Sequence, residues 1–238
     1  MRTVLDIHTH TIASGHAYNS IYEMAYSASN KGVKVLGISD HGPAMEGSAS
    51  KHYFRSSRCV PRKLYGVQIL FGCELNIIDL HGTVDLDDTF SSILDYGIAS
   101  MHDVCLTSGT KKENLHAYQK AMKNPKVNVI GHPDDGIFPV NFDELACAAA
   151  DHGVMLELNE VSVNPRSYRQ NGRQNAYQML EACAKQYVHV LVSSDAHIEC
   201  NILEHYNAIK ILEEIGFEER LVVNTSIDKL INLLNIKN

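Results

Sequence analysis

Residues 5–11 read LDIHTHT, an apolar run typical of a strand that ends in two histidines, His8 and His10. On a β-strand, alternate side chains share one face, so this spacing directs both imidazoles to the same side, together with Asp6. Burial of three polar groups on one face is unfavourable unless something there binds them. The stretch therefore predicts a strand that leads into a polar site.

Similar apolar runs recur along the 238 residues of the chain. Their β-branched residues and lengths predict strands at 3–8, 35–40, 68–74, 97–102, 128–132, 154–158 and 189–194. Helical periodicity and capping residues predict helices at 21–31, 142–152, 175–186, 201–215 and 227–235. Because strands that alternate with helices favour parallel pairing through crossovers, the pattern predicts a closed or nearly closed α/β barrel in a single domain, 1–238.

Composition and charge are those of an ordinary globular protein. Hydrophobic residues make up 45% of the chain and charged residues 21%, and the formal net charge is −7. This balance is sufficient for a sizeable core and gives no basic surface for nonspecific binding to nucleic acid or membranes. No apolar run of about 20 residues could span a bilayer, and no signal peptide is expected because a strand begins almost at once. The six scattered cysteines predict reduced thiols in a cytoplasmic protein.

Side chains of the types that bind metals stand at the carboxyl ends of six predicted strands. In a barrel of parallel strands these ends meet at one rim, where the active site lies. A further histidine lies in the first loop, within reach of the same rim. The set comprises His8, His10, His16, His41, Glu74, His102, His132, Asp195 and His197.

Each member of this set also has an ordinary explanation. A histidine at a strand end is often only hydrogen-bonded, the SDHG stretch at 39–42 could be a turn, and Glu74 could be an ion-pair partner. Convergence of the whole set on one rim is harder to attribute to chance, and it favours a metal site. The remaining histidines are interpreted as structural or surface residues: His52, His81 and His189, with His116, His152 and His205 in helical stretches.

Three stretches of the chain resemble the polymerase and histidinol phosphatase (PHP) family, and within it the compact bacterial probable phosphatases of the YcdX type. They are DIHTHTIASGHAY (6–18), GISDHGPAMEG (37–47) and SSDAH (193–197), together with the strand-end glutamate and two isolated strand-end histidines. The resemblance runs in order through nearly the whole chain. It implies a distorted (β/α)7 barrel, a TIM-barrel-like α/β fold.

The resemblance also implies three divalent metal ions per chain, with zinc as the first expectation and manganese or iron as alternatives. The first ion would be held by His8, His10, Glu74 and Asp195. Glu74 would bridge to a second ion, completed by His102 and His132. The third would be held by His16, His41 and His197.

The chemistry of such a centre suits hydrolysis of a phosphate monoester. Imidazole and carboxylate bind zinc and similar ions, and a bridging Glu74 would place two ions roughly 3.5–4 Å apart. Three dications and two carboxylates would leave about +4 at the site, which attracts a phosphate dianion. We therefore expect a phosphatase with a metal-bridging hydroxide, in which Asp195 orients or deprotonates the water and either a metal ion or His197 assists the leaving group.

Two carboxylates are candidates for orienting the ligands. Asp6 and Asp40 could each accept the second ring N–H of a ligating histidine, or could cap a turn or form a buried ion pair.

Two loops are candidates for contact with the substrate. Arg166, Arg169 and Arg173, in the 164–175 loop, could bind a phosphate or form a solvated basic loop. Segment 45–62 could close over the rim or only pack on it.

Other functions remain open at this point. A nuclease-type phosphodiesterase is disfavoured by the acidic chain, and a non-catalytic regulatory module by the complete set of ligands. Metal-dependent amidohydrolases also begin with HxH, but they typically use a lysine where this chain has Glu74. The expected partner is a small-molecule phosphoester, without nucleic acid or membrane; a homo-oligomer is possible, and the natural substrate cannot be read from the residues.

Overall fold

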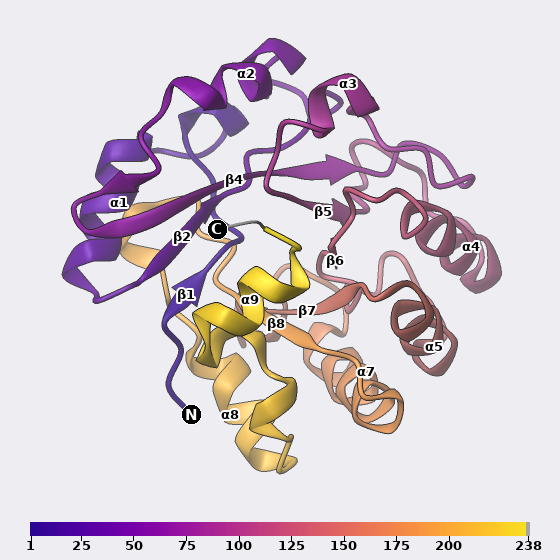
Figure 1. The fold of residues 1–238 in the computed structure, drawn as a ribbon. Helices are drawn as coiled ribbons and strands as arrows, with labels where there is room; N and C mark the ends of the chain where they lie inside the picture. Colours follow the sequence, from indigo (N-terminus) through magenta and orange to yellow (C-terminus); the bar gives the residue numbers. More distant parts are fainter. Residues whose placement is uncertain (237–238) are drawn as a thin grey trace.

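A curved sheet with helices around its outside forms the fold in a computed structural model that describes residues 1–236 (Figure 1). Within this range the sheet has eight strands, of which seven are parallel and follow one another in chain order. The parallel strands are β1 (Leu5–Asp6), β2 (Val35–Ile38), β4 (Val67–Asn76), β5 (Tyr96–Ser100), β6 (Val129–Ile130), β7 (Met155–Asn159) and β8 (Val190–Ser193). All seven predicted strands are present and the distorted (β/α)7 barrel is confirmed, whereas the short antiparallel β3 (Lys63–Leu64) beside β4 was not predicted.

The barrel is distorted where β1 meets β8. Thr9 and Ala196 form one parallel bridge there, and the buried side chain of Asn224 joins the two strands. Its amide nitrogen donates to the carbonyl oxygens of Leu5 and Val192 at 3.0 and 2.7 Å, and its oxygen accepts the Val192 N–H at 2.7 Å. Between these two strands, the Asn224 side chain therefore supplies hydrogen bonds that backbone groups supply between the other strands.

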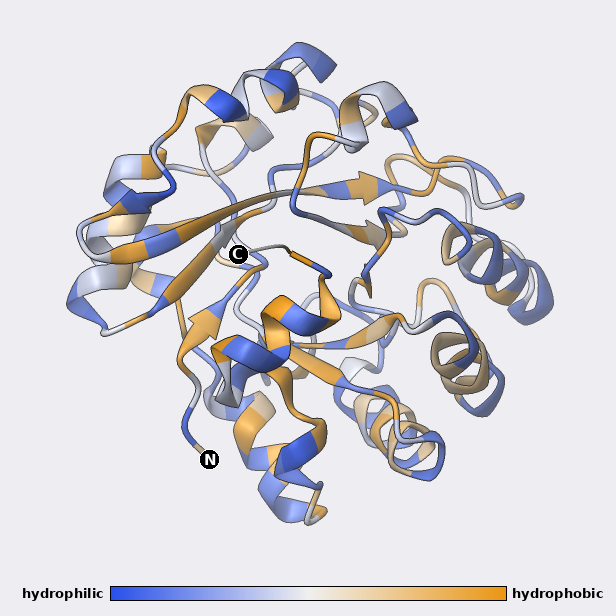
Figure 2. Ribbon diagram, in the orientation of Figure 1, coloured by the Kyte–Doolittle hydropathy of each residue, from blue (hydrophilic) through white to orange (hydrophobic). Residues whose placement is uncertain are grey.

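The helices lie outside the strands, where their apolar faces cover the sheet (Figure 2). They are α1 (Ile21–Asn30), α2 (Lys51–Ser56), α3 (Asp88–Ser91), α4 (Lys111–Ala121), α5 (Phe142–His152), α6 (Glu160–Val163), α7 (Gly172–Gln186), α8 (Tyr206–Glu214) and α9 (Ile227–Leu233). Local sequence fixes several of their ends. Ser20 and Glu23 form a capping box at the start of α1, and Gly153 ends α5 with a φ of 66°.

One predicted helix, 201–215, begins later than expected. The buried carboxylate of Glu160 accepts the backbone N–H groups of Asn207 and Ala208, which fixes the start of α8 at Tyr206. The preceding residues form a loop in which Leu203 has a φ of 61°. The sequence had indicated that His205 lies inside this helix. His205 instead precedes α8 and is buried beside Asp6.

Helix α9 closes the end of the barrel opposite the carboxyl ends of the strands. Leu230 and Leu234 pack with Leu5 and Tyr96 in the apolar cluster inside the barrel, and Figure 1 shows α9 lying across that opening. One end of the barrel is thus filled by apolar side chains, and the other end is left to polar ones. Within residues 1–236, no helix combines the length and hydrophobicity needed to cross a bilayer.

Candidate metal centre

The nine predicted ligands converge at the carboxyl ends of the strands. His8 and His10 follow β1, His41 follows β2, and Glu74 lies near the end of β4. His102 and His132 follow β5 and β6, and Asp195 and His197 follow β8. Six of the nine line a cavity of about 340 Å³: His16, His41, Glu74, His102, Asp195 and His197. The remaining three, His8, His10 and His132, lie beneath it and are buried. The structure thus brings the whole set together, and the ligand role of each member remains a prediction.

Glu74 is the centre of the cluster. Its buried carboxylate is approached by imidazoles from five histidines. Its Oε1 lies 3.3 Å from His8 Nε2, 3.3 Å from His102 Nε2 and 2.9 Å from His132 Nε2. Its Oε2 lies 3.6 Å from His10 Nε2 and 2.7 Å from His41 Nδ1. One carboxylate with nitrogen donors on both oxygens is the arrangement expected of a bridge between two cations.

His8 and His10 lie close to two carboxylates. His8 Nε2 lies 3.3 Å from Glu74 Oε1 and 3.6 Å from Asp195 Oδ1, and His10 Nε2 lies 3.6 Å from Glu74 Oε2 and 3.2 Å from Asp195 Oδ1. Ligands bound tetrahedrally at 2.0–2.1 Å stand about 3.3–3.4 Å apart. One ligand atom each from His8, His10 and Glu74 also lies within 4.8 Å of the other two, so these three residues could hold one ion, with Asp195 beside them.

The far ring nitrogens show which atoms are free for a cation. His8 Nδ1 lies 2.5 Å from Glu157 Oε1, and His102 Nδ1 lies 2.7 Å from Asn76 Oδ1. Both partners are acceptors, so each Nδ1 carries a hydrogen, and in the neutral ring each Nε2 carries a lone pair. Those lone pairs would face the oxygens of Glu74, an arrangement that is repulsive unless a proton or a metal ion stands between them.

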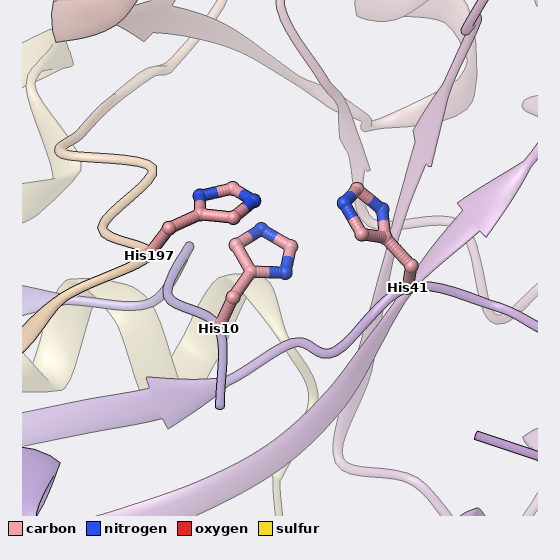
Figure 3. A group of neighbouring side chains, drawn as sticks. All are labelled: His10, His41 and His197. Carbon is pink, nitrogen blue, oxygen red and sulfur yellow. The ribbon is translucent and has the colours of Figure 1, made fainter. Parts of the chain in front are cut away.

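A similar pattern holds at His197 and His10. His197 Nδ1 donates to the backbone carbonyl of Asp195 at 2.9 Å, and His197 Nε2 then faces His16 Nε2 at 3.1 Å. Figure 3 shows the rings of His10, His41 and His197 turned toward one another, and one nitrogen from each lies within 4.8 Å of the other two. His10 Nε2 also faces Glu74 and Asp195, so His41 and His197, with His16 beside them, would be left to hold a further ion.

Several of these atoms have no hydrogen-bond partner among residues 1–236. They are His8 Nε2, His10 Nε2, His41 Nδ1 and Glu74 Oε2, all of them buried. The last two lie 2.7 Å apart but do not meet at hydrogen-bonding angles. A buried polar atom without a partner costs about 1–3 kcal/mol, so four in one place call for an explanation. Divalent cations would satisfy all four, and the donor set therefore fits metal ions.

The electrostatics of the site also favour a cation. Burial opposes charge on His8, but the carboxylates of Glu157, Glu74 and Asp195 outweigh it and raise the His8 pKa well above its usual range. Burial likewise disfavours the charged form of Glu74, yet His41, His8 and His102 lower the Glu74 pKa well below normal. The carboxylates are ionised and attract positive charge, whether it is carried by protons or by metal ions.

Two of the predicted ligands have unusual backbone conformations. His132 has a φ of 30° and Asp195 a φ of 53°. Residues other than glycine rarely adopt the left-handed region, at a cost of about 1–3 kcal/mol, and such strain clusters at functional sites.

Only one of the three predicted arginines reaches the cavity. Arg169 is buried, and its guanidinium donates to Asp195 Oδ2 at 2.8 Å and to Ser162 Oγ at 3.0 Å. Arg173 points elsewhere and pairs with Glu214 at 3.0 Å, and Arg166 is exposed on the loop. The structure therefore does not bring Arg166 and Arg173 to the site, because the chain turns into α7 directly after Arg169.

The two carboxylates expected to orient ligands differ in their contacts. Asp6 points away from the cluster, because Leu5 and Ile7 on either side of it face the barrel interior. It accepts from Ser194 Oγ and from the Leu203 N–H and lies 3.5 Å from His205 Nε2, so its contacts fit the alternative, a cap and buried ion pair, rather than an orienting role. Asp40 does lie at the site, but it reaches His10 only through Ser14.

Sequence reasoning missed the side chains that orient the rings. Glu157 binds His8 and also accepts the His132 N–H at 2.6 Å, and Asn76 binds His102. The signal for Glu157 was present, since it is an acid inside an otherwise apolar predicted strand.

Fold and site together define a TIM-barrel-like protein with a cluster of histidines and carboxylates at the carboxyl ends of its strands. The PHP domain model matches residues 6–203, and the chain belongs to the PHP family. This confirms the family indicated by the sequence motifs.

Two relatives that match along nearly the full length of the chain are probable phosphatases. A probable phosphatase from Caldicellulosiruptor saccharolyticus is 39% identical over 232 residues, which cover 98% of this chain and 96% of that protein. A probable phosphatase from Clostridium botulinum (strain Langeland) is 40% identical over 237 residues, which cover 100% and 96%.

Solved structures with the same fold are more distant in sequence. A histidinol phosphate phosphatase from Lactococcus lactis, in complex with zinc, L-histidinol and phosphate, superposes with a TM-score of 0.62 at 17% identity and covers 91% of this chain and 95% of its own. A chain of an archaeal ribonuclease P complex with mature tRNA gives 0.60 at 14% identity, with coverage of 97% and 90%. At these identities the likeness concerns the fold.

Proposed function

We propose that this protein is a metal-dependent phosphatase that hydrolyses a phosphate monoester at a centre of three divalent ions, with zinc as the first candidate. The observation that carries the proposal is the group of buried histidine nitrogens around Glu74 that have no hydrogen-bond partner. The probable phosphatases at 39–40% identity support the reaction class, and the zinc and phosphate bound by the Lactococcus lactis enzyme support the metal and the substrate group.

In this proposal the nine predicted ligands divide as the sequence motifs implied. Glu74 would bridge the first and second ions, because its carboxylate lies 3.3–3.6 Å from His8 and His10, assigned to the first ion, and 3.3 Å from His102, assigned to the second. Divalent ions bound there would acidify water and draw the oxygens of a phosphate into the cavity.

The chain itself would position the reactants. Asp195 is ionised: burial disfavours its charge, but the charges of His8, Arg169 and His197 outweigh burial and hold its pKa well below the usual range. Its Oδ2 is held by Arg169, which leaves Oδ1 directed at the cluster to orient or deprotonate an attacking water. His197 lies on the cavity wall, where it could assist the departing alkoxide.

The surroundings favour a small substrate. The cavity of about 340 Å³ is at the lower end of the range for small-molecule sites. Its mouth carries the acidic Glu46 and Asp103, and its one arginine, Arg169, is already bound to Asp195. Such a mouth does not favour a long polyanion such as DNA.

The test combines elemental analysis of the purified full chain with a screen of phosphoesters. We expect about three metal equivalents per chain and release of phosphate from monoesters, including a chromogenic one, in excess of cleavage of single-stranded DNA. Glu74→Ala should lose metal and activity together, because it removes the central carboxylate.

The matched control is His116→Ala, a histidine exposed on α4 and outside the cluster. It should keep both metal and activity. Equal behaviour of the two variants would contradict the site assignment, and faster cleavage of DNA would favour a phosphodiesterase. Metal-loaded protein that is inactive on every ester would favour a non-catalytic role.

A further inference from the structure

Segment 45–62 reaches Asp40, behind the metal centre, through one tyrosine. Tyr53 lies on α2, and its hydroxyl donates to Asp40 Oδ2 at 2.6 Å. Burial, followed by the neighbouring Asp40 carboxylate, raises the pKa of Tyr53 well above its usual value, so the phenol keeps its hydrogen and acts as the donor.

Asp40 is fully buried and depends on such donors. Its Oδ1 accepts the Thr11 N–H at 2.6 Å and Ser14 Oγ at 2.7 Å, and its Oδ2 accepts Thr11 Oγ1 at 2.9 Å and the Tyr53 hydroxyl. Four hydrogen bonds from three residues therefore hold one buried carboxylate. Tyr53 is the one donor of the three that lies outside the loop carrying His10 and His16.

Ser14 connects Asp40 to His10, a predicted metal ligand, through hydrogen bonds. Its only hydrogen goes to Asp40, so its oxygen must act as the acceptor toward His10 Nδ1 at 3.0 Å. His10 is thereby held as the tautomer with hydrogen on Nδ1. Its Nε2 lone pair then faces Asp195 Oδ1 at 3.2 Å, where a cation would bind.

We propose that Tyr53 is a positioning residue for the metal centre, acting through Asp40 and Ser14 on His10. The inference rests on the metal centre proposed above and does not depend on the reaction. It gives segment 45–62 a role besides covering the rim: contact of α2 with Asp40 prepares His10 to bind an ion.

Tyr53→Phe is a mild test, because the ring also forms a wall of a neighbouring apolar cavity with Ile12 and Tyr22 and would be kept. Substitutions behind a ligating histidine weaken metal affinity by about 10–100-fold. Tyr53 is two hydrogen bonds further from His10 than Ser14 is. We therefore expect a loss of about tenfold in zinc affinity, measured by competition with a chromophoric chelator. The thermal midpoint of the metal-free protein should change little.

The matched control is Tyr177→Phe, which also removes a hydroxyl that donates to a carboxylate, that of Glu214, but lies on α7 away from the site. It should bind zinc as the wild type does. The visible absorption of the cobalt-loaded protein, which reports ligand geometry, should change for Tyr53→Phe alone.

A double-mutant cycle tests the path. Ser14→Ala should lose about 100-fold in zinc affinity, and adding Tyr53→Phe to it should cause little further loss. Wild-type affinity in Tyr53→Phe, or single losses that multiply in the double variant, would overturn the proposal. A wild-type chain that binds no metal would instead contradict the proposed function, so the two failures are distinguishable.

Discussion

At the scale of single residues, the rings of two predicted ligands, His8 and His102, are oriented by side chains from other strands. His41 and Asp195 stand in short motifs next to predicted strand ends, so local sequence was sufficient to find them. Glu157 binds His8 across 149 positions of the chain, and Asn76 binds His102 across 26. Such contacts depend on how strands are placed in the barrel, which local patterns do not specify.

Glu157 gives the sharpest prediction at this scale. Its two oxygens receive His8 Nδ1, the His132 N–H, the Ser193 hydroxyl and the Asn159 amide. Glu157→Gln keeps the shape but turns an NH₂ group toward these donors. We therefore expect metal affinity to fall by about 10–100-fold, measured by chelator competition.

Glu181→Gln is the control for this change, because Glu181 is exposed on α7 and far along the chain from any predicted ligand. It should leave the affinity unchanged. Unchanged affinity in Glu157→Gln would show that His8 does not need its carboxylate partner to bind metal.

At the scale of elements, prediction succeeded where periodicity and caps agree. The range 142–152 was predicted for α5 and found, with Asn141 and Gly153 at its ends. Helix α4 was not among the predicted ranges because KKENLHAYQKA is mostly polar, although Thr110 and Glu113 form a capping box at its start. The two-residue β3 is too short to give a pattern at all.

The closure between β1 and β8 depends on one side chain, which makes it testable. Asn224→Ala would leave the Val192 N–H and the carbonyls of Leu5 and Val192 without their partner inside the protein. An unsatisfied buried group costs about 1–3 kcal/mol, so we expect unfolding free energy to fall by at least about 2 kcal/mol, measured by urea denaturation.

The same substitution at Asn232, exposed on α9, should change the unfolding free energy by less than about 0.5 kcal/mol. If the two alanine variants were equally stable, Asn224 would not be the link that closes the barrel.

At the scale of the whole molecule, the two ends of the barrel have opposite chemistry. The end covered by α9 is apolar, with Leu230 packed against strand residues, and this helix lies beyond residues 6–203 matched by the family model. The histidines in the sequence predicted the polar end. The sequence did not predict that α9 covers the other end, because the leucines of α9 would suit any amphipathic surface helix. The prediction of a single domain over 1–238 is consistent with this packing and remains a prediction.

The concentration of unpartnered polar atoms at one end predicts that the stability of the whole fold depends on bound metal. An ion that binds only the folded chain, present at 100 times its dissociation constant, stabilises it by about 2.7 kcal/mol. For a chain of this size each kcal/mol shifts the unfolding midpoint by about 2–4 °C, so removal of one such ion should lower the midpoint by roughly 5–10 °C.

The apolar end and the outer core do not involve the ions, so the metal-free protein should still fold and show the same far-ultraviolet circular dichroism. Addition of zinc should restore the midpoint of the wild type but not that of Glu74→Ala, in which the central carboxylate is missing. An identical midpoint before and after chelation, in protein shown by elemental analysis to have lost its metal, would mean that the cluster does not need cations to be stable.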